Sequence, residues 1–288
     1  MAKWSPSNDS TLYAWYNETG LGSAGANVTT WSDQSGNSRD LSESGSVSAT
    51  VTSGTVNGIK GVQFVETASL KRASFVDLDS QDFLMACFVR DNNEDDTELG
   101  APFVDLGTAN GGGFGLFHTD FGTFLALTVN KQSGSVSINT LNNASDMVEI
   151  VDHIGGGLVF TLFRQGSTVK CRANGVEILS LTESPSSTNA EALNMGAYDG
   201  NAANDTVSLQ NYETHFYLGS SISDELVEEV EGYMLHRFGK DSQLAASHSY
   251  KDHTPASGLH GVHNQDLIGD LALDVSGPLV SDTLAGAI

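Results

Sequence analysis

Basic residues are scarce in this chain of 288 residues. Lys and Arg together number 13, against 36 Asp and Glu, so the formal net charge is −23. A surface with this excess of negative charge repels the phosphates of nucleic acids and of anionic membranes. The composition therefore excludes nucleic acid and membrane surfaces as partners.

Cysteine and long apolar runs are also scarce. The two cysteines, Cys87 and Cys171, are too few for a disulfide framework, and no C-x-x-C pair is present to bind zinc. Both lie in apolar, strand-like segments, so we expect buried free thiols. No window approaches the ~18 apolar residues of a membrane helix, and the first residues lack the apolar core of a secretion signal. We therefore expect a protein made in the cytoplasm, without a membrane segment.

Short β-branched and aromatic runs, separated by Gly, Asn, Asp and Ser, make up most of the sequence. Residues 169–173 alternate between apolar and basic side chains, the pattern of a strand with one buried face. Asn174-Gly175 follows and fits a type I′ hairpin turn, whose central residues both need positive φ. Because no helices separate the runs, the sequence predicts an all-β antiparallel sandwich or jelly roll.

One segment, residues 223–239, has helical spacing instead. Ser223 is a good N-cap, and Gly239 suits the left-handed position after the C-terminus. The apolar residues on one face are Leu226, Val230, Tyr233 and Met234. The sequence predicts one α-helix here.

The character changes again after Tyr250. Residues 251–288 combine turn residues with small apolar clusters, without a sustained period. Their Leu, Val and Ile content is high for a disordered segment. We expect a domain over residues 1–250 and an extended tail over 251–288 that docks on its own domain or on a neighbouring subunit.

Several motifs match a known family. Val28–Leu41 resembles the V-x-x-W-x-D-x-S-G-N-x-R-x-L motif of concanavalin A-like (laminin-G-like) jelly-roll domains. Leu12–Tyr16 and Gly58–Phe64 resemble two of their strands. Val230–Gly239 resembles their C-terminal helix, with Phe238 in place of the usual Trp, and Leu244–Tyr250 resembles the loop that follows. The resemblance spans residues 10 to about 250.

The resemblance implies a concanavalin A-like β-sandwich with one short C-terminal helix. Such domains occur in bacterial surface proteins and in tailed-phage virion proteins. Together with the absence of a secretion signal and the apolar tail, the resemblance favours a non-enzymatic virion protein, such as a head decoration, turret or tail-fibre subunit, with glycan binding as an added role. Residues 251–288 would then contact other virion proteins or copies of this chain. The alternatives are a carbohydrate-binding module of a cell-surface or extracellular protein and a polysaccharide-degrading enzyme.

The W-x-D-x-S-G-N segment also has a local explanation. Asp33, Ser35 and Asn37 can bond to their own backbone, and Gly36 supplies a positive φ. Trp31 would anchor the segment in the core. We interpret the motif as a structural corner first and leave a ligand role open.

Candidate catalytic residues are few. A glycoside hydrolase needs two carboxylates facing one cleft, and the nearest pair is Glu149 and Asp152. Three residues apart on a strand, they point to opposite faces. Gly111–Gly115 precedes a strand rather than a helix, so it lacks a helix N-terminus for phosphate. We expect no enzymatic activity.

Two oxygen-rich loops are candidates for calcium. One covers residues 91–98, and the other contains Asp199, Asn201 and Asp205. Neither has the spacing of an EF-hand, so solvated loops are the alternative. His260 and His263 would bind a metal only if other subunits supplied ligands.

Most aromatic residues are expected in the core. These are Trp15, Trp31, Phe64, Phe83, Phe88, Phe160, Phe163 and Phe216. Tyr198 and Tyr212 lie beside polar loops and are predicted to be exposed rings on which a sugar stacks. With Asp199 and Asn201 they form the predicted glycan site.

Overall fold

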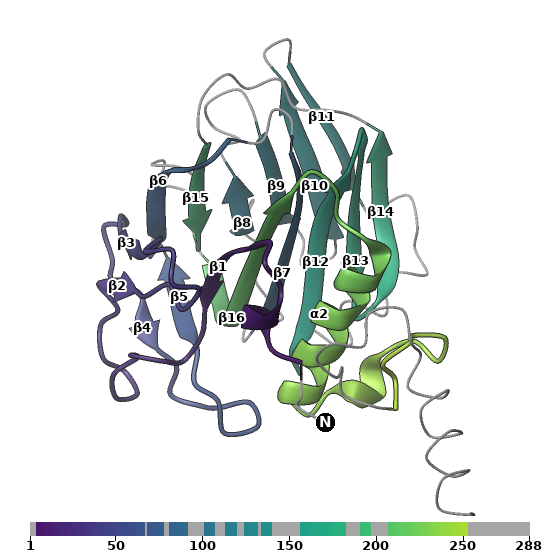
Figure 1. Ribbon diagram of the computed structural model, residues 1–288. Helices are drawn as coiled ribbons and strands as arrows, with labels where there is room; N and C mark the ends of the chain where they lie inside the picture. The colour runs from purple at the N-terminus through teal and green to yellow at the C-terminus, as the bar shows by residue number, and fades with distance from the viewer. Residues whose placement is uncertain are drawn as a thin grey trace, which may run out of the picture.

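The structure, a computed structural model, has two antiparallel β-sheets and one α-helix among the residues that it describes (Figure 1). It describes residues 4–66, 68–77, 81–91, 101–106, 113–119, 124–131, 134–139, 156–182, 191–196 and 207–252. The predicted all-β sandwich is confirmed.

The first sheet, here called the helix-side sheet, has the strand order β14-β13-β12-β7-β16-β5-β4, and β1 also pairs with β16. Its strands are β1 (Leu12–Tyr16), β4 (Thr50–Val51), β5 (Val62–Glu66), β7 (Asp82–Asp91), β12 (Leu158–Gln165), β13 (Thr168–Ala173), β14 (Val176–Thr182) and β16 (Val207–Gly219).

The second sheet, here called the opposite sheet, has the order β11-β10-β9-β8-β15-β6-β3-β2. Its strands are β2 (Thr30–Trp31), β3 (Leu41–Glu43), β6 (Leu70–Val76), β8 (Ala101–Leu106), β9 (Gly113–Thr119), β10 (Phe124–Lys131), β11 (Gly134–Asn139) and β15 (Glu191–Met195).

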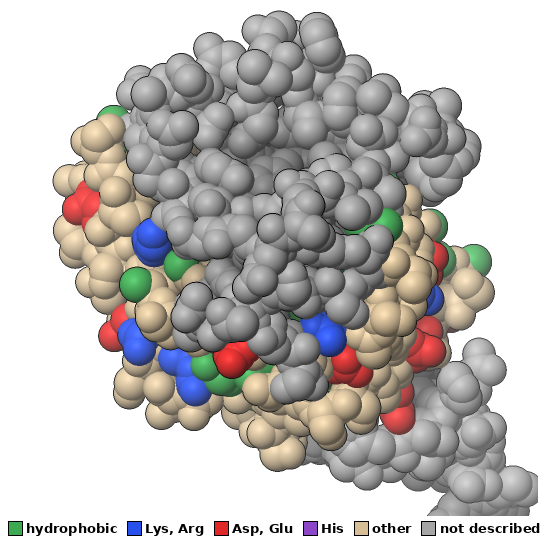
Figure 2. Space-filling view, turned by 90° about the horizontal axis from the view of Figure 1, so that it is seen from above, with side chains coloured by type: hydrophobic (Ala, Val, Ile, Leu, Met, Phe, Trp, Pro, Cys, Tyr) green, Lys and Arg blue, Asp and Glu red, His purple; other side chains and the backbone are tan. Residues whose placement is uncertain are grey.

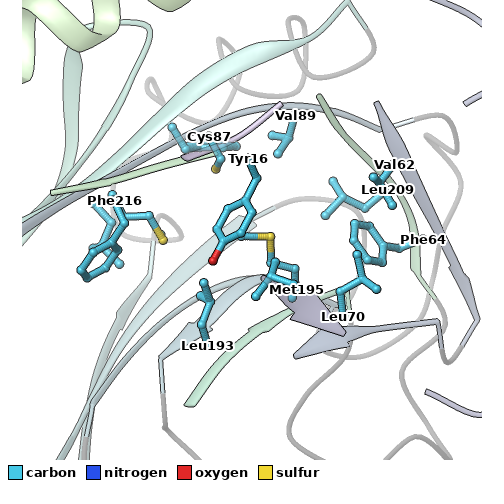
Figure 3. Close-up of a cluster of buried hydrophobic side chains, with 14 of the residues drawn as sticks. Tyr16, Val62, Phe64, Leu70, Cys87, Val89, Leu193, Met195, Leu209 and Phe216 are labelled. Atoms are coloured by element: carbon cyan, nitrogen blue, oxygen red, sulfur yellow. The ribbon is translucent and has the colours of Figure 1, made fainter. Parts of the chain in front are cut away.

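The main core lies between the sheets. Figure 3 shows side chains from both sheets pointing toward one another around Tyr16 of β1, with Phe216 from β16 and Met195 from β15. Cys87 and Cys171 are in this layer, and both are buried free thiols, as predicted. Burial raises the pKa of the Cys87 thiol to about 12, because the interior disfavours a thiolate.

Helix α2 (Asp224–Arg237) covers the outer face of the helix-side sheet and packs against β7 and β12 (Figure 1). Its predicted caps are confirmed: Ser223 Oγ accepts from the Leu226 N–H at 3.1 Å, and Gly239 has a φ of 66°. Phe238, the residue that follows α2, stacks on Phe88 at a ring-centroid distance of 3.9 Å. Within the described ranges, a short 3₁₀ helix, η1 (Pro6–Asn8), precedes the strands, and another, η4 (Asp241–Gln243), follows α2.

The aromatic residues predicted in the core divide between the two layers. Phe88 and Phe163 lie in the outer layer beneath α2, and the others that are buried lie between the sheets. Trp15 is the exception, because its side chain is only partly buried. It stands on β1 next to His215, on the outer face of the sheet.

A β-bulge in β16 shapes the outer layer. Asn211 pairs with Val89 and Glu213 with Phe88, so Tyr212 is one extra residue in β16. Its side chain and that of Glu213 therefore both reach the outer face. The partner on the other flank of β16 also changes here, from β5 up to residue 211 to β1 from residue 214.

Two Asn-Gly turns have the geometry of a type I′ hairpin. Asn174 and Gly175 have φ values of 47° and 84°, as predicted for the β13–β14 connection. Asn57 and Gly58, with φ of 51° and 78°, form a second such turn before β5. The Asn57 amide donates to the Arg237 carbonyl at 2.7 Å and thereby caps the C-terminus of α2.

Candidate functional site

Most predicted site residues lie outside the described residues. This holds for Tyr198, Asp199, Asn201 and Asp205 of the predicted glycan and calcium loop. It also holds for Glu149, Asp152, residues 92–98 and the late histidines His253, His260 and His263. Their roles stay predictions.

Tyr212, the fourth predicted glycan contact, is described, and its predicted exposure is wrong. The residue is 0% exposed. Its hydroxyl donates to Gln210 Oε1 at 2.7 Å, and its ring packs edge-on against Phe88 and Phe238. The cause is the bulge, which turns Tyr212 beneath α2. Burial raises the pKa of the Tyr212 hydroxyl.

The W-x-D-x-S-G-N segment forms the expected corner. Asp33 accepts hydrogen bonds from the backbone N–H groups of Trp15, Ser35 and Arg39 at 2.9–3.0 Å. The Trp31 side chain is 0% exposed. Gly36 has a φ of 86°.

The other end of the corner is fixed to β1. The Asn37 amide donates to the carbonyls of Leu12 and Tyr13 at 3.2 and 3.1 Å. The motif's hydrogen bonds are thus made within the fold, which supports the structural interpretation.

A group of hydrogen-bonded ionisable side chains lies between β16 and α2, around Glu213. Its Oε1 accepts from Trp15 Nε1 at 2.8 Å and lies 2.7 Å from His215 Nε2. Its Oε2 accepts from Arg237 Nε at 2.6 Å, and Arg237 also pairs with Glu18. Glu213 and His215 are both 0% exposed.

The environment of Glu213 favours its charged form. Burial alone would raise the pKa of this carboxyl group. The hydrogen bond from His215 and the charges of His215 and Arg237 outweigh burial, so the pKa lies below its ordinary value near 4.5. Glu213 is therefore an ionised side chain held by several donors.

A second buried carboxylate, Glu231 of α2, lies over β12 and β13. It accepts from Thr161 Oγ1 at 2.7 Å and forms an ion pair with Arg172 at 3.2 Å. His248 Nε2 lies 3.2 Å from the same oxygen that pairs with Arg172. The Glu231 side chain is 0% exposed.

These residue types are the ones that acid–base catalysts use, but their setting differs. A general acid or base has to reach the proton that it transfers in the substrate. Glu213, His215 and Glu231 are sealed from solvent and bonded within the protein. The two clusters tie β1, β16 and the segment around His248 to α2.

Sequence reasoning did not find these clusters. A signal was present in residues 207–219, where polar side chains occur inside an otherwise apolar strand. The partners come from positions as distant as Trp15 and Arg237, so only the fold brings them together.

The described residues give no sign of a metal centre. Within the ranges described, no group of three or more His, Cys, Asp or Glu side chains is arranged to hold a metal ion. Figure 2 shows acidic and basic side chains interspersed at the lower left of the view and several acidic side chains together at the lower right. Among the described helices, none is long and apolar enough to cross a membrane.

No family model matches the chain, and a search of curated proteins finds no match. Solved structures with a similar fold include the binding domain of Paraclostridial Mosquitocidal Protein 1 (15% identity, TM-score 0.54, 80% of this chain and 53% of that chain). The binding domain of botulinum neurotoxin serotype D is 9% identical (TM-score 0.56; 78% and 52%). A third structure is of botulinum neurotoxin type C, a toxin whose cell entry depends on interaction with two ganglioside molecules. It is 14% identical, with a TM-score of 0.54, over 78% of this chain and 51% of that chain.

This chain spans about half the length of those structures. At these identities the likeness concerns the fold alone. It places the chain among antiparallel β-sandwiches, and two of these three structures are named as binding domains.

Proposed function

We propose that this chain is a non-enzymatic binding and assembly module. In this proposal it is a structural subunit of a tailed-virus particle: a head decoration, turret or tail-fibre protein built on a concanavalin A-like jelly roll. Residues 251–288 contact other virion proteins or further copies of the chain, and the jelly roll also binds surface glycans.

The observation that carries the proposal is the burial of the acid–base side chains. Within the described part of the chain, Glu213, His215 and Glu231 are 0% exposed, and their hydrogen bonds go to α2 and the strands beneath it. Such clusters stabilise a scaffold rather than act on a substrate. The likeness to toxin binding domains is consistent with recognition as the role.

The proposed glycan contacts are Tyr198, Asp199 and Asn201, with Asp199, Asn201 and Asp205 as calcium ligands. These residues belong to segment 197–206, which connects β15 of the opposite sheet to β16 of the helix-side sheet. Tyr212 is not among the proposed glycan contacts, because its side chain is buried. The ganglioside dependence of botulinum neurotoxin type C motivates, by analogy of fold, a glycan as the ligand.

Assembly is tested by removing the tail. The cut is best made after Asp252, because Tyr250 and Lys251 still contact the domain. We expect the full chain to sediment as an oligomer and the truncated chain as a folded monomer. Unchanged assembly after truncation would contradict the assembly role of residues 251–288.

Glycan binding is tested on a glycan array with and without calcium. We expect Tyr198→Ala to lose binding, whereas Tyr212→Phe, a conservative change at a buried ring, keeps it. Binding by an isolated domain that never assembles would favour the second candidate, a carbohydrate-binding module. Release of reducing sugar that Glu149→Gln abolishes would overturn the non-enzymatic proposal.

A further inference from the structure

The segment Leu244–Lys251, here called the strap, lies along α2 and is fastened at both ends. Leu244 is 3% exposed and belongs to the apolar layer beneath α2. Lys251 Nζ donates to the carbonyls of Asp241, Ser242 and Leu244 at 3.2, 2.6 and 2.7 Å. The Tyr250 carbonyl lies 2.8 Å from His236 Nε2. The strap therefore holds the chain against the domain as far as Lys251.

Two glycines provide the space into which strap side chains fit. A Cβ on Gly232 of α2 would stand 2.5 Å from Tyr250 Cβ. A Cβ on Gly175 of the β13–β14 turn would stand 2.6 Å from His248 Cδ2. Both distances are too short for any other residue, so Gly232 and Gly175 make room for Tyr250 and His248.

The hydrogen bonds of His248 define its protonation state. Its Nδ1 accepts from the Tyr250 backbone N–H at 3.2 Å. A backbone N–H can only donate, so Nδ1 carries a lone pair. Its Nε2 lies 3.2 Å from Glu231 Oε2, which can only accept. The bound ring is therefore the neutral tautomer with hydrogen on Nε2.

Protonation of Nδ1 would place an N–H against the Tyr250 N–H and break that hydrogen bond. The imidazolium would also be a second cation beside Glu231, which already pairs with Arg172 at 3.2 Å. The His248 side chain is 0% exposed, so water cannot solvate the added charge. The negative charge of Glu231 attracts the imidazolium and opposes these effects. Arg172 already pairs with the same carboxylate oxygen, which weakens that attraction.

Other charged groups face the strap from α2 and from the η4 side. On α2, Glu228 accepts from Ser249 Oγ, and Glu225 and Glu229 lie near the Tyr250 ring. His236 donates through Nε2, a contact that both of its protonation states can make. From the η4 side, Lys251 bonds only to carbonyl oxygens. Among these groups, His248 alone has a contact that requires its neutral form.

We propose that the strap is a pH-sensitive latch controlled by His248. Neutral His248 holds residues 244–251 on α2, and its protonation releases them together with the start of the tail. The proposal concerns the strap itself and holds whether or not the tail assembles.

Hydrogen exchange of the full chain at pH 7.5 and pH 5.5, corrected for intrinsic rates, tests the latch. In the wild type we expect strap amides to lose protection about tenfold on acidification, because the released strap would bind one proton more than the strap held on α2. Amides of β7 and β12 should keep their protection and report that the domain stays folded. Equal strap protection at both pH values would overturn the proposal.

Two variants separate the latch from general loosening. His248→Gln keeps one donor and one acceptor without a titrating proton, so strap protection should be the same at both pH values. Gly232→Ala adds a methyl group where Tyr250 lies, although alanine itself favours a helix. Its strap should be unprotected at both pH values with the sheet unchanged. A Gly232→Ala strap as protected as the wild type, or a His248→Gln strap that still opens at pH 5.5, would contradict the latch.

Discussion

At the scale of single residues, Gly61 shows how one missing side chain allows two strands to approach. A Cβ at this position would stand 2.6 Å from the Asn211 carbonyl oxygen and 2.9 Å from Tyr212 Cα. Both contacts are with the backbone of the bulge, which cannot move aside as a flexible side chain can. Gly61 is therefore part of what lets β5 pair with β16 directly before the bulge.

Gly61→Ala tests this approach. We expect the free energy of unfolding, measured with urea, to fall by about 1–3 kcal/mol, the usual cost of overpacking. Gly54→Ala is the matched control, because a Cβ at Gly54 would have no neighbour within 4 Å. The close approach would be unimportant if the two variants were equally stable.

The two buried thiols give a second prediction at this scale. Burial raises the pKa of Cys87 to about 12 and that of Cys171 well above its ordinary value. Because only the thiolate reacts, neither thiol should react with Ellman's reagent in the native protein at pH 8. Both should react in denaturant. Release of one equivalent of thionitrobenzoate per chain without denaturant would show that one cysteine is accessible.

At the scale of elements, α2 depends on contributions from distant parts of the chain. Its N-terminus is capped locally by Ser223, but its C-terminus is capped by Asn57 of the turn before β5. Arg237, the last residue of the helix, also pairs with Glu213 of β16 and Glu18 beyond β1. The helix and the sheet beneath it therefore stabilise each other.

Replacing Asn57 separates capping from turn geometry. Asn57→Gly keeps a residue that tolerates a φ of 51° but removes the amide that donates to Arg237. We expect a loss of about 1 kcal/mol in the free energy of unfolding, the typical net value of one hydrogen bond. Asn57→Ala should cost more, because it adds backbone strain. Equal stability of wild type and Asn57→Gly would show that the hydrogen bond from Asn57 to Arg237 does not stabilise the fold.

The elements also show how far sequence reasoning reaches. The alternation in residues 169–173, the Asn174-Gly175 turn and the caps of α2 are local patterns, and the structure has all of them. The bulge at Tyr212 depends on how β16 pairs with β7, so the sequence around Tyr212 does not predict it. That one extra residue moved Tyr212 from the predicted surface to the interior.

At the scale of the whole molecule, the ionised Glu213 links stability to pH. Its pKa is lower in the folded chain than its ordinary value near 4.5, so the unfolded chain binds the proton more tightly. Its contribution is fully present above pH 4.5 and is lost as the pH falls through the lower, folded value.

Urea unfolding between pH 7 and pH 3 checks this linkage. Glu213→Gln should lower stability at pH 7, by ~3–5 kcal/mol if the pair behaves like other buried pairs that lose one partner. Its stability should also fall less steeply than that of the wild type below pH 4.5. Glu177→Gln, at an exposed ion pair with Lys170, is the control. Parallel pH profiles for wild type and Glu213→Gln would exclude the linkage.

The central place of β16 has a consequence for how this chain reaches its native state. Among the described strands β16 comes last in sequence, yet it lies between β7 and β5 and is the partner with which β1 pairs. A nascent chain that ends before residue 207 would leave both neighbours with open edges and β1 alone. Such edges invite pairing with other chains, and contacts this distant in sequence form slowly. The helix-side sheet therefore closes only after the ribosome has synthesised residues 207–219, and a cell that makes this protein has to protect its unfinished edges until then.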